Sequence, residues 1–231
     1  MNETAEHIAW AAGDSDETLL DRVLNGDLNA YEGIMRRHNQ RLFRLARSIV
    51  TVDAEAMDVV QASYIAAYQR LGELEEPAAL GTWLAKIVRN TALMHLRRNR
   101  RYQQMDEPDF EKVLNLSRPV QEQRQPDKEL ANSQLRQVLE NCIDELPDPF
   151  RSVFVLRAVE HCSIHDVAEI LEIKEATVKT RFHRARLLLQ KRLLEYGSTG
   201  SVVIHEFAGH RCDTVVRNVL RELRAMAVPI G

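Results

Sequence analysis

The sequence lacks the features that define several special classes of protein. Its three cysteines are odd in number and far apart, which argues against a disulfide framework and suits a reducing cytosol. No apolar run approaches the roughly 20 residues that span a membrane. The acidic N-terminus also lacks the charged-then-apolar order of a secretion signal. We therefore expect a cytoplasmic protein.

Signatures of catalysis and of metal binding are absent as well. We find no phosphate-binding loop, no nucleophile elbow and no paired acid and base, so we predict no enzyme, no cofactor and no small-molecule substrate. Two groups contain residue types that bind zinc: His161, Cys162 and His165, and His205, His210 and Cys212. Neither group has a paired C-x2-C or an evident fourth ligand, so we predict no metal. A reactive thiol at Cys162 is the alternative.

Positive charge is concentrated in two short segments, although the whole chain has a formal net charge of −3. Residues 86–101 contain six cations and no acid, and residues 174–192 contain seven cations against Glu175. Residues 1–32 have the opposite bias, with eight acids against Arg22. This segregation indicates two local contacts with a polyanion. Two solvated helix faces are the alternative.

Apolar residues recur at helical spacing through most of the chain, and the first half shows no alternation typical of strands. Helical segments fill residues 16–101, with a break at Asn25-Gly26, and helical spacing returns over residues 130–196. Between them, residues 102–129 contain three prolines and predict a flexible linker. We expect an all-α fold of two helical domains, followed by a C-terminal extension, residues 197–231, whose one helix Asp213 caps.

The segment from residue 163 to 193 has the pattern of a helix-turn-helix. Ser163 and Asp166 are the N-cap and N3 pair of a short helix, and the next three residues after Leu171 have the length of the turn. On the longer helix, the side opposite the apolar stripe presents residue types that bind base edges and phosphates in the major groove. These are Lys179, Thr180, His183 and Arg184, with Arg181 and Arg186 better placed for phosphate. A solvated helix of a bundle is the alternative.

The other cationic segment, residues 81–101, predicts a second nucleic-acid surface. Opposite its apolar face lie Lys86, Arg89, Asn90, Arg97 and Arg100, with Trp83 at the margin. An indole beside cations and an amide can hold a base that has left the stack, through stacking and polar contacts to its edge. The alternative is that the indole belongs to the core.

These motifs resemble the sigma-70 family of bacterial RNA polymerase specificity factors, in its compact extracytoplasmic-function (ECF) group. The resemblance covers residues 16–196. DAEAMDVVQASYIAAYQRL is similar to region 2.2, and GTWLAKIVRNTALMHLRRNRR to regions 2.3–2.4. LPDPFRSVFVLRAVEHCSIHDVAEILEIKEATVKTRFHRARLLLQKRL is similar to region 4.

The resemblance implies a factor that binds core RNA polymerase, directs it to specific promoters and helps to open the −10 element. Contacts to the −10 element would map to Trp83, Lys86, Arg89, Asn90 and Arg97, and contacts to the −35 element to Lys179, Thr180, His183 and Arg184. The clamp helices of the polymerase largest subunit would dock on Asp58, Gln61 and Ile65. Next to this set the chain has Ala62 and Ser63, where family members commonly have an acid and Thr.

The sequence allows two modes of regulation and a second class of function. The resemblance implies an anti-sigma factor as a further partner, and control by the C-terminal extension is the alternative. We also expect the isolated factor to bind promoter DNA poorly until polymerase uncovers or aligns its two DNA-binding surfaces. The alternative function is a self-sufficient helix-turn-helix regulator, whose N-terminal helices sense a ligand or dimerise.

Overall fold

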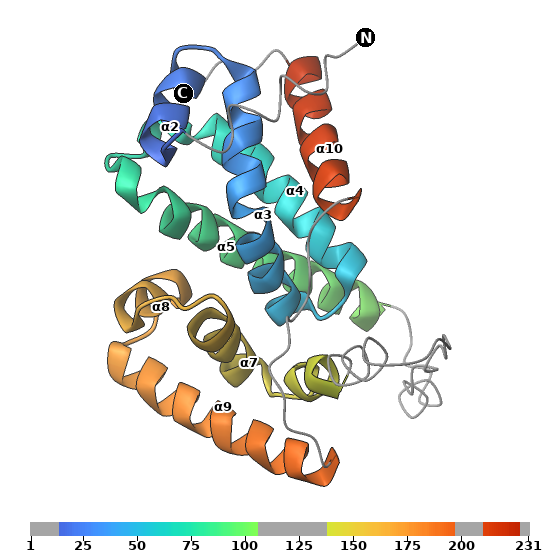
Figure 1. Ribbon diagram of the computed structural model, residues 1–231. Coiled ribbons are helices and arrows are strands. Elements are labelled where there is room, and N and C mark those ends of the chain that lie inside the picture. The colour runs from blue at the N-terminus through green and yellow to red at the C-terminus, as the bar shows by residue number, and fades with distance from the viewer. Residues whose placement is uncertain (1–13, 106–137, 197–209, 227–231) are drawn as a thin grey trace, which may run out of the picture.

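The computed structural model describes residues 14–105, 138–196 and 210–226, and every regular element in these ranges is helical (Figure 1). The predicted all-α fold is therefore confirmed. The elements are α2 (Asp16–Leu24), α3 (Leu28–Val50), α4 (Asp53–Gln69), η1 (Leu71–Glu73), η2 (Pro77–Ala79), α5 (Leu80–Met105), a helix over residues 138–144, α7 (Asp148–Phe154), η4 (Val155–Val159), α8 (Ile164–Leu171), α9 (Glu175–Tyr196) and α10 (His210–Met226). Among these helices none is long and apolar enough to cross a bilayer.

Helices α2 to α5 form an N-terminal unit with α3 at its centre, in contact with α2, α4 and α5. Its core contains two tyrosines whose rings meet edge to face, Tyr31 and Tyr64, both fully buried. Each hydroxyl is satisfied, because Tyr31 donates to the main-chain oxygen of Tyr64 at 2.7 Å and Tyr64 donates to that of Met35 at 3.2 Å. A buried hydroxyl with no partner would destabilise the fold, so this pair fixes how α3 and α4 pack.

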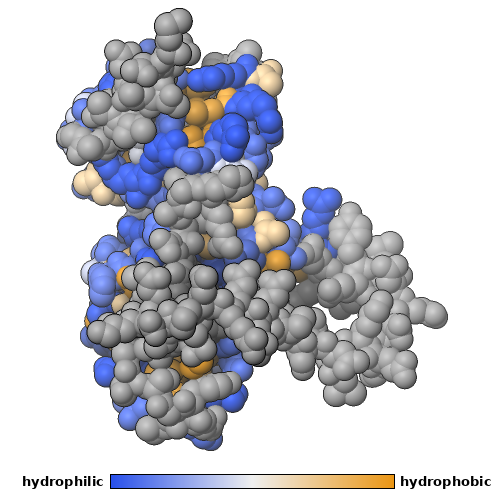
Figure 2. Space-filling model, turned by 45° about the vertical axis from the view of Figure 1, so that its right-hand side comes forward, coloured by the Kyte–Doolittle hydropathy of each residue, from blue (hydrophilic) through white to orange (hydrophobic). Residues whose placement is uncertain are grey.

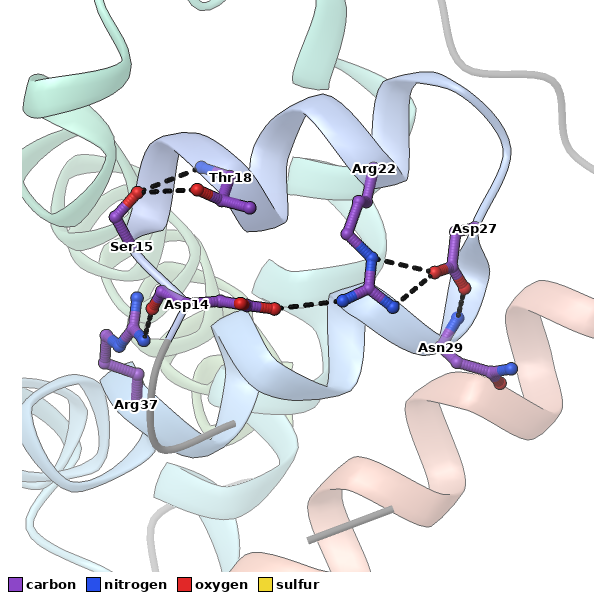
Figure 3. Close-up of polar contacts among 7 residues, drawn as sticks. All are labelled: Asp14, Ser15, Thr18, Arg22, Asp27, Asn29 and Arg37. Carbon is purple, nitrogen blue, oxygen red and sulfur yellow. Dashed lines mark hydrogen bonds and ion pairs between the residues drawn. The ribbon is translucent and has the colours of Figure 1, made fainter. Parts of the chain in front are cut away.

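Polar contacts hold α2 at its place beside α3 (Figure 3). Ser15 caps the helix by accepting a hydrogen bond from a main-chain N–H of the first turn, a contact that contributes about 1 kcal/mol. Arg22 bridges Asp14 at 2.9 Å and Asp27 at 2.7 Å, and Asp27 in turn caps α3. The break predicted at Asn25-Gly26 is confirmed, since Gly26 takes φ +93° there.

The helix over residues 138–144, α7, η4, α8 and α9 form a C-terminal unit. Cys142 is 1% exposed within its core. The α-helix α7 continues directly into η4, which is a π-helix. Arg157 of η4 donates to the main-chain oxygen of Cys162, and its guanidinium carbon lies 5.7 Å from the ring centre of Phe182. These contacts tie α7 and η4 to the neighbouring helix-turn-helix.

The two units also touch each other directly, which the sequence did not indicate. Helix α8 packs on α5, and α7 and η4 pack on α3, so that one apolar cluster runs through both units. Polar contacts reinforce the interface, with Arg44 2.6 Å from Glu160 and Arg47 2.6 Å from Asp144. Of the predicted flexible linker, residues 102–129, the first four residues belong to α5, and the others lie outside the described residues. We call this packed state the closed arrangement.

Helix α10 of the C-terminal extension packs on α4 and α3 of the N-terminal unit (Figure 1). Its apolar stripe is buried: Val215, Val216, Val219, Leu220 and Leu223. The prediction that Asp213 caps this helix is wrong, because the helix already begins at His210 and places Asp213 in the first turn.

The visible described surface is largely hydrophilic, with small apolar patches set among polar side chains (Figure 2). Most large apolar side chains are therefore inside, and those of the α10 stripe are inside as well. Exposed large apolar residues include Met94 on α5 and Leu187 and Leu188 on α9. Scattered exposed apolar residues of this kind are normal on a soluble surface and need no partner of their own.

Candidate nucleic-acid interface

The helix-turn-helix is built from α8 and α9 as the sequence predicts. Ser163 Oγ accepts from the N–H of Asp166 at 3.0 Å, and Asp166 Oδ2 accepts from the N–H of Ser163 at 3.1 Å, which completes the predicted capping box. The hydrogen bond from Ser163 holds the pKa of Asp166 below its ordinary value. The turn spans the three residues after Leu171, as expected. Its first residue, Glu172, lies in the left-handed region at φ 53°, ψ 48°.

The outer side of α9 presents the residues predicted to contact a duplex. Lys179, Thr180, His183, Arg184 and Arg186 are exposed, whereas Arg181 is half-buried. The Thr180 hydroxyl donates to the main-chain oxygen of Ala176 at 2.9 Å. The geometry thus agrees with a recognition helix whose first three turns are accessible.

A shallow hollow at the start of α9 adds residues that the sequence did not single out. It is lined by Pro149 and Phe150 of α7 together with Ala176, Thr177, Thr180, Arg181 and Arg184 of α9. Pro147 is the N-cap of α7 and Pro149 lies in its first turn, so these two prolines mark the boundary at which the helix begins. The structure brings that boundary beside the cationic side chains of α9.

On α5, the second predicted surface is only partly open. Asn90 and Arg97 are exposed, and Trp83 is half-buried against the core. The side chain of Arg100 lies outside the described residues. Lys86 and Arg89, expected on an open face, instead form ion pairs with the C-terminal unit: Lys86 Nζ lies 2.6 Å from Glu169 and Arg89 Nη1 lies 2.5 Å from Glu172.

In the closed arrangement, therefore, carboxylates of the helix-turn-helix neutralise cations of the other predicted DNA surface. Glu169 and Glu172 are about half exposed, so each pair contributes little free energy, up to about 1 kcal/mol. The apolar packing of α8 on α5 supplies the rest of the stabilisation. The outer side of α9 stays accessible while part of the α5 surface is covered.

The residues predicted to bind a protein partner lie on α4, beside α10. Asp58 is exposed, and Ile65 is half-buried against the core. Gln61 is half-buried, and its side-chain oxygen accepts a hydrogen bond from Asn218 Nδ2 of α10 at 3.2 Å. The predicted set thus shares one helix, but one of its members already has a partner within the chain.

Of the candidate thiol and metal residues, the structure describes Cys162 and its two histidine neighbours. Cys162 is 6% exposed, and burial raises the pKa of its thiol, which disfavours the reactive thiolate. Across the described ranges, no three His, Cys, Asp or Glu side chains are grouped as metal ligands would be. His205, and the side chains of His210 and Cys212, lie outside what is described.

Two family models match the chain and cover both helical units. Sigma-70 region 2 matches residues 34–102, and Sigma-70 region 4 matches residues 136–189. The chain belongs to the sigma-70 family. In this sigma factor, region 2 runs from within α3 to within α5, and region 4 ends within α9, after the candidate recognition residues.

The sigma factor is similar to curated sigma factors of several bacteria. It is 29% identical over 182 residues to the RNA polymerase sigma-H factor of Pseudomonas aeruginosa, covering 78% of this chain and 94% of the relative. It is 28% identical over 176 residues to the ECF RNA polymerase sigma factor SigW of Bacillus subtilis, covering 75% and 94%. The predicted placement in the ECF group is therefore confirmed.

Two solved structures share the fold. The sigma factor RpoE of Bartonella quintana, solved with the anti-sigma factor NepR, aligns with a TM-score of 0.54 at 22% identity over 75% of this chain and 98% of that one. CnrH, solved with the cytosolic domain of CnrY, aligns with a TM-score of 0.55 at 24% identity over 80% and 100%. As a sigma factor, the protein binds core RNA polymerase and promoter DNA and directs the polymerase to promoters.

Proposed function

We propose that this sigma factor divides promoter recognition between α9 and α5 and docks on polymerase through α4. Helix α9 would bind the −35 element through Lys179, Thr180, His183 and Arg184, with phosphate contacts from Arg181 and Arg186. The observation that carries this assignment is the accessible cationic side of α9 within a complete helix-turn-helix. Bidentate and charge-assisted contacts of these residue types distinguish base pairs by about 1–3 kcal/mol each.

Helix α5 would capture a base of the −10 element once it leaves the stack. Trp83 offers a ring for stacking, Asn90 a polar group for the base edge, and Lys86, Arg89, Arg97 and Arg100 charge for the backbone. Unstacking costs a few kcal/mol, which these contacts offset. Docking of Asp58, Gln61 and Ile65 on the polymerase would hold α5 at that position. The sigma factor would supply no catalysis of its own and would act in the cytoplasm, where polymerase meets the chromosome.

The closed arrangement supports the expectation that free factor binds promoters poorly. While Lys86 and Arg89 pair with Glu169 and Glu172, they are not available to DNA. Polymerase would separate region 2 from region 4 and so uncover the α5 surface. The similarity to a sigma factor solved with NepR also supports an anti-sigma factor as a third partner.

Run-off transcription with purified core polymerase tests the assignment. With fragmented genomic DNA of the source bacterium as template, we expect transcripts whose 5′ ends share upstream elements. Replacing Asn90 and Arg97 by Ala, or Lys179 and Arg184 by Ala, should lower the yield of these transcripts at least tenfold. The matched control is Arg192→Ala, a cation near the other end of α9 that lies 3.3 Å from Glu145.

Two results would contradict the proposal. Transcript yields that survive both double substitutions would remove α5 and α9 from promoter recognition. Tight, sequence-specific binding by the free protein in a mobility-shift assay, without polymerase, would instead favour the self-sufficient regulator.

A further inference from the structure

Helix α10 packs on α3 and α4 of region 2, and its Asn218 donates to Gln61, one of the proposed docking residues. We propose that α10 is an intramolecular competitor of RNA polymerase: it binds the surface formed by α3 and α4 and leaves it when polymerase docks. This inference rests on the proposed function, because it takes Asp58, Gln61 and Ile65 as the docking set. Its support comes from the contacts that α10 makes with α3 and α4.

The composition of α4 explains why its surface accepts a helix. From Val59 to Gln69 the helix has no charged residue, and apolar or small side chains lie on all its sides. A helix that is apolar all round is stable only when it is covered all round. Helices α3 and α5 cover part of α4, and α10 covers a further part with the buried stripe centred on Val219. An amphipathic helix is therefore the kind of partner that this surface fits.

Three polar contacts set the register of α10 along this surface. Asp213 in its first turn lies 2.8 Å from Arg36 of α3, Asn218 in its middle donates to Gln61 of α4, and Arg224 near its end donates to Asn29 at 3.0 Å. Such contacts, spaced along the whole helix, distinguish a specific docking from incidental apolar contact.

The same contacts make the docking reversible. The side chains of Arg36 and Asp213 are 38% and 51% exposed, so water can replace their ion pair at little cost. The contact between Asn218 and Gln61 uses a member of the docking set. Polymerase that binds Gln61 must therefore break a contact of α10 and can substitute its own.

Covalent attachment favours α10 over a partner in solution. A tethered segment acts at an effective concentration in the millimolar range, so even a weak helix keeps its site filled. The apparent dissociation constant for polymerase then rises by the inverse of the fraction of molecules with the site open. A 17-residue helix alone in water is only marginally stable. We therefore expect α10 to unfold once it leaves this surface.

Release of α10 by mutation is the first test. Val219→Asp puts a charge at a fully buried position of the stripe and should make full-length protein bind purified core polymerase at least tenfold more tightly. Ala225→Asp makes the same change in charge at an exposed position of the same helix and should leave the affinity unchanged. Binding is measured by fluorescence anisotropy of dye-labelled sigma factor, with circular dichroism to verify folding.

Locking α10 in place is the second test, and it does not depend on a destabilised variant. In a Cys212→Ser background, Arg36→Cys and Asp213→Cys are joined by a short bis-maleimide; Cys142 and Cys162 are buried and protected from the reagent. Cross-linking should weaken binding to core polymerase at least tenfold, relative to the same protein treated with a monofunctional maleimide.

The outcomes separate this inference from the proposed function. If cross-linked protein binds polymerase as well as its monofunctional control, α10 does not compete, and the proposed function stands. A folded Val219→Asp variant that binds more weakly than the unchanged protein would equally overturn the inference, because α10 would then support docking. If neither the unchanged protein nor any variant binds core polymerase, the proposed function itself fails.

Discussion

At the scale of single residues, the carboxylate of Asp16 links α2 to α3. Its protonation can be followed through its effect on the stability of the fold. Its oxygens lie 3.1 Å from His38 Nε2 and 2.5 Å from Arg37 Nη1, both on α3. The hydrogen bond with His38, more than that with Arg37, lowers the pKa of Asp16 from 3.8 to about 2, although burial opposes the shift. A carboxyl group with a lowered pKa in the folded state stabilises the protein only while it is ionised.

We therefore predict that Asp16→Asn lowers the free energy of unfolding in a pH-dependent way. The shift corresponds to at most about 2.5 kcal/mol, and solvent screening at a side chain 29% exposed reduces our expectation to about 1 kcal/mol. Because the folded pKa lies below the unfolded one, the loss should be complete above pH of about 4 and shrink as pH falls toward 2. Urea unfolding at several pH values between 3 and 7 measures it.

The control for this prediction is Asp21→Asn, the same change at an exposed position of α2. It should change the free energy of unfolding by less than about 0.5 kcal/mol at every pH. A difference between Asp16→Asn and the unchanged protein that stays constant down to pH 3 would argue against the ion-pair account.

At the scale of elements, the sequence predicted the helices well and their partners poorly. The spacing of apolar residues predicted helices where α3, α4 and α9 lie, and Ser163 with Asp166 predicted the start of α8. Both signals are local in the sequence, because a helix cap and an apolar stripe involve residues of one helix. The start of α10 was missed by four residues, since an acid is as common in a first turn as at a cap.

Contacts between distant elements could not be predicted in the same way. A stripe identifies which side of a helix is apolar but not which helix covers it. The pairing of Lys86 with Glu169, 83 positions away, therefore has no local signature, and neither has the pairing of Gln61 with Asn218. These two contacts affect how open the α5 surface and the α4 surface are, so the accessibility of the two candidate surfaces could not be predicted from the sequence.

The contact between α8 and α5 leads to a prediction for the free sigma factor. Glu169→Gln together with Glu172→Gln removes both ion pairs, which contribute about 1 kcal/mol in total. Without polymerase, the double variant should bind single-stranded DNA bearing the −10 sequence about fivefold more tightly than the unchanged protein. Fluorescence anisotropy with an oligonucleotide taken from the run-off promoters measures the affinity.

Glu75→Gln together with Glu76→Gln provides the matched control, because both side chains are exposed and the change in net charge is the same. If this control tightens binding as much as the α8 variant does, the effect reflects overall charge and not the uncovering of α5.

At the scale of the whole molecule, the two regions are joined by a buried arginine. Arg47 of region 2 has a side chain 5% exposed and donates through two nitrogens to Asp144 of region 4, at 2.9 and 2.6 Å. Its Nε donates to Asp53 at 2.7 Å within region 2. Arg47 therefore keeps one partner when the regions separate, whereas its contact with Asp144 exists only in the closed arrangement.

We predict that Asp144→Asn shifts the sigma factor from the closed arrangement toward separated regions. The charge-assisted contacts with Arg47 contribute about 1.5–3 kcal/mol, so the ratio of open to closed molecules should rise about 10- to 100-fold. Small-angle X-ray scattering should then give a larger radius of gyration. Glu145→Gln removes one negative charge from an exposed pair with Arg192, which lies on α9, and should leave the scattering unchanged; identical curves for both variants would refute the prediction.

Glu169 and Glu172 act on Lys86 and Arg89 as DNA phosphates would, and this mimicry alters how the protein responds to ionic strength. Counterion release makes the logarithm of DNA affinity fall by about 0.9 per phosphate contact for each tenfold rise in salt. At Lys86 and Arg89, salt also loosens the internal carboxylates and so frees the same cations. For the free factor, the slope of the logarithm of DNA affinity against the logarithm of salt concentration should therefore be shallower than expected. It should correspond to fewer phosphate contacts than the number of cations on the DNA-binding surfaces.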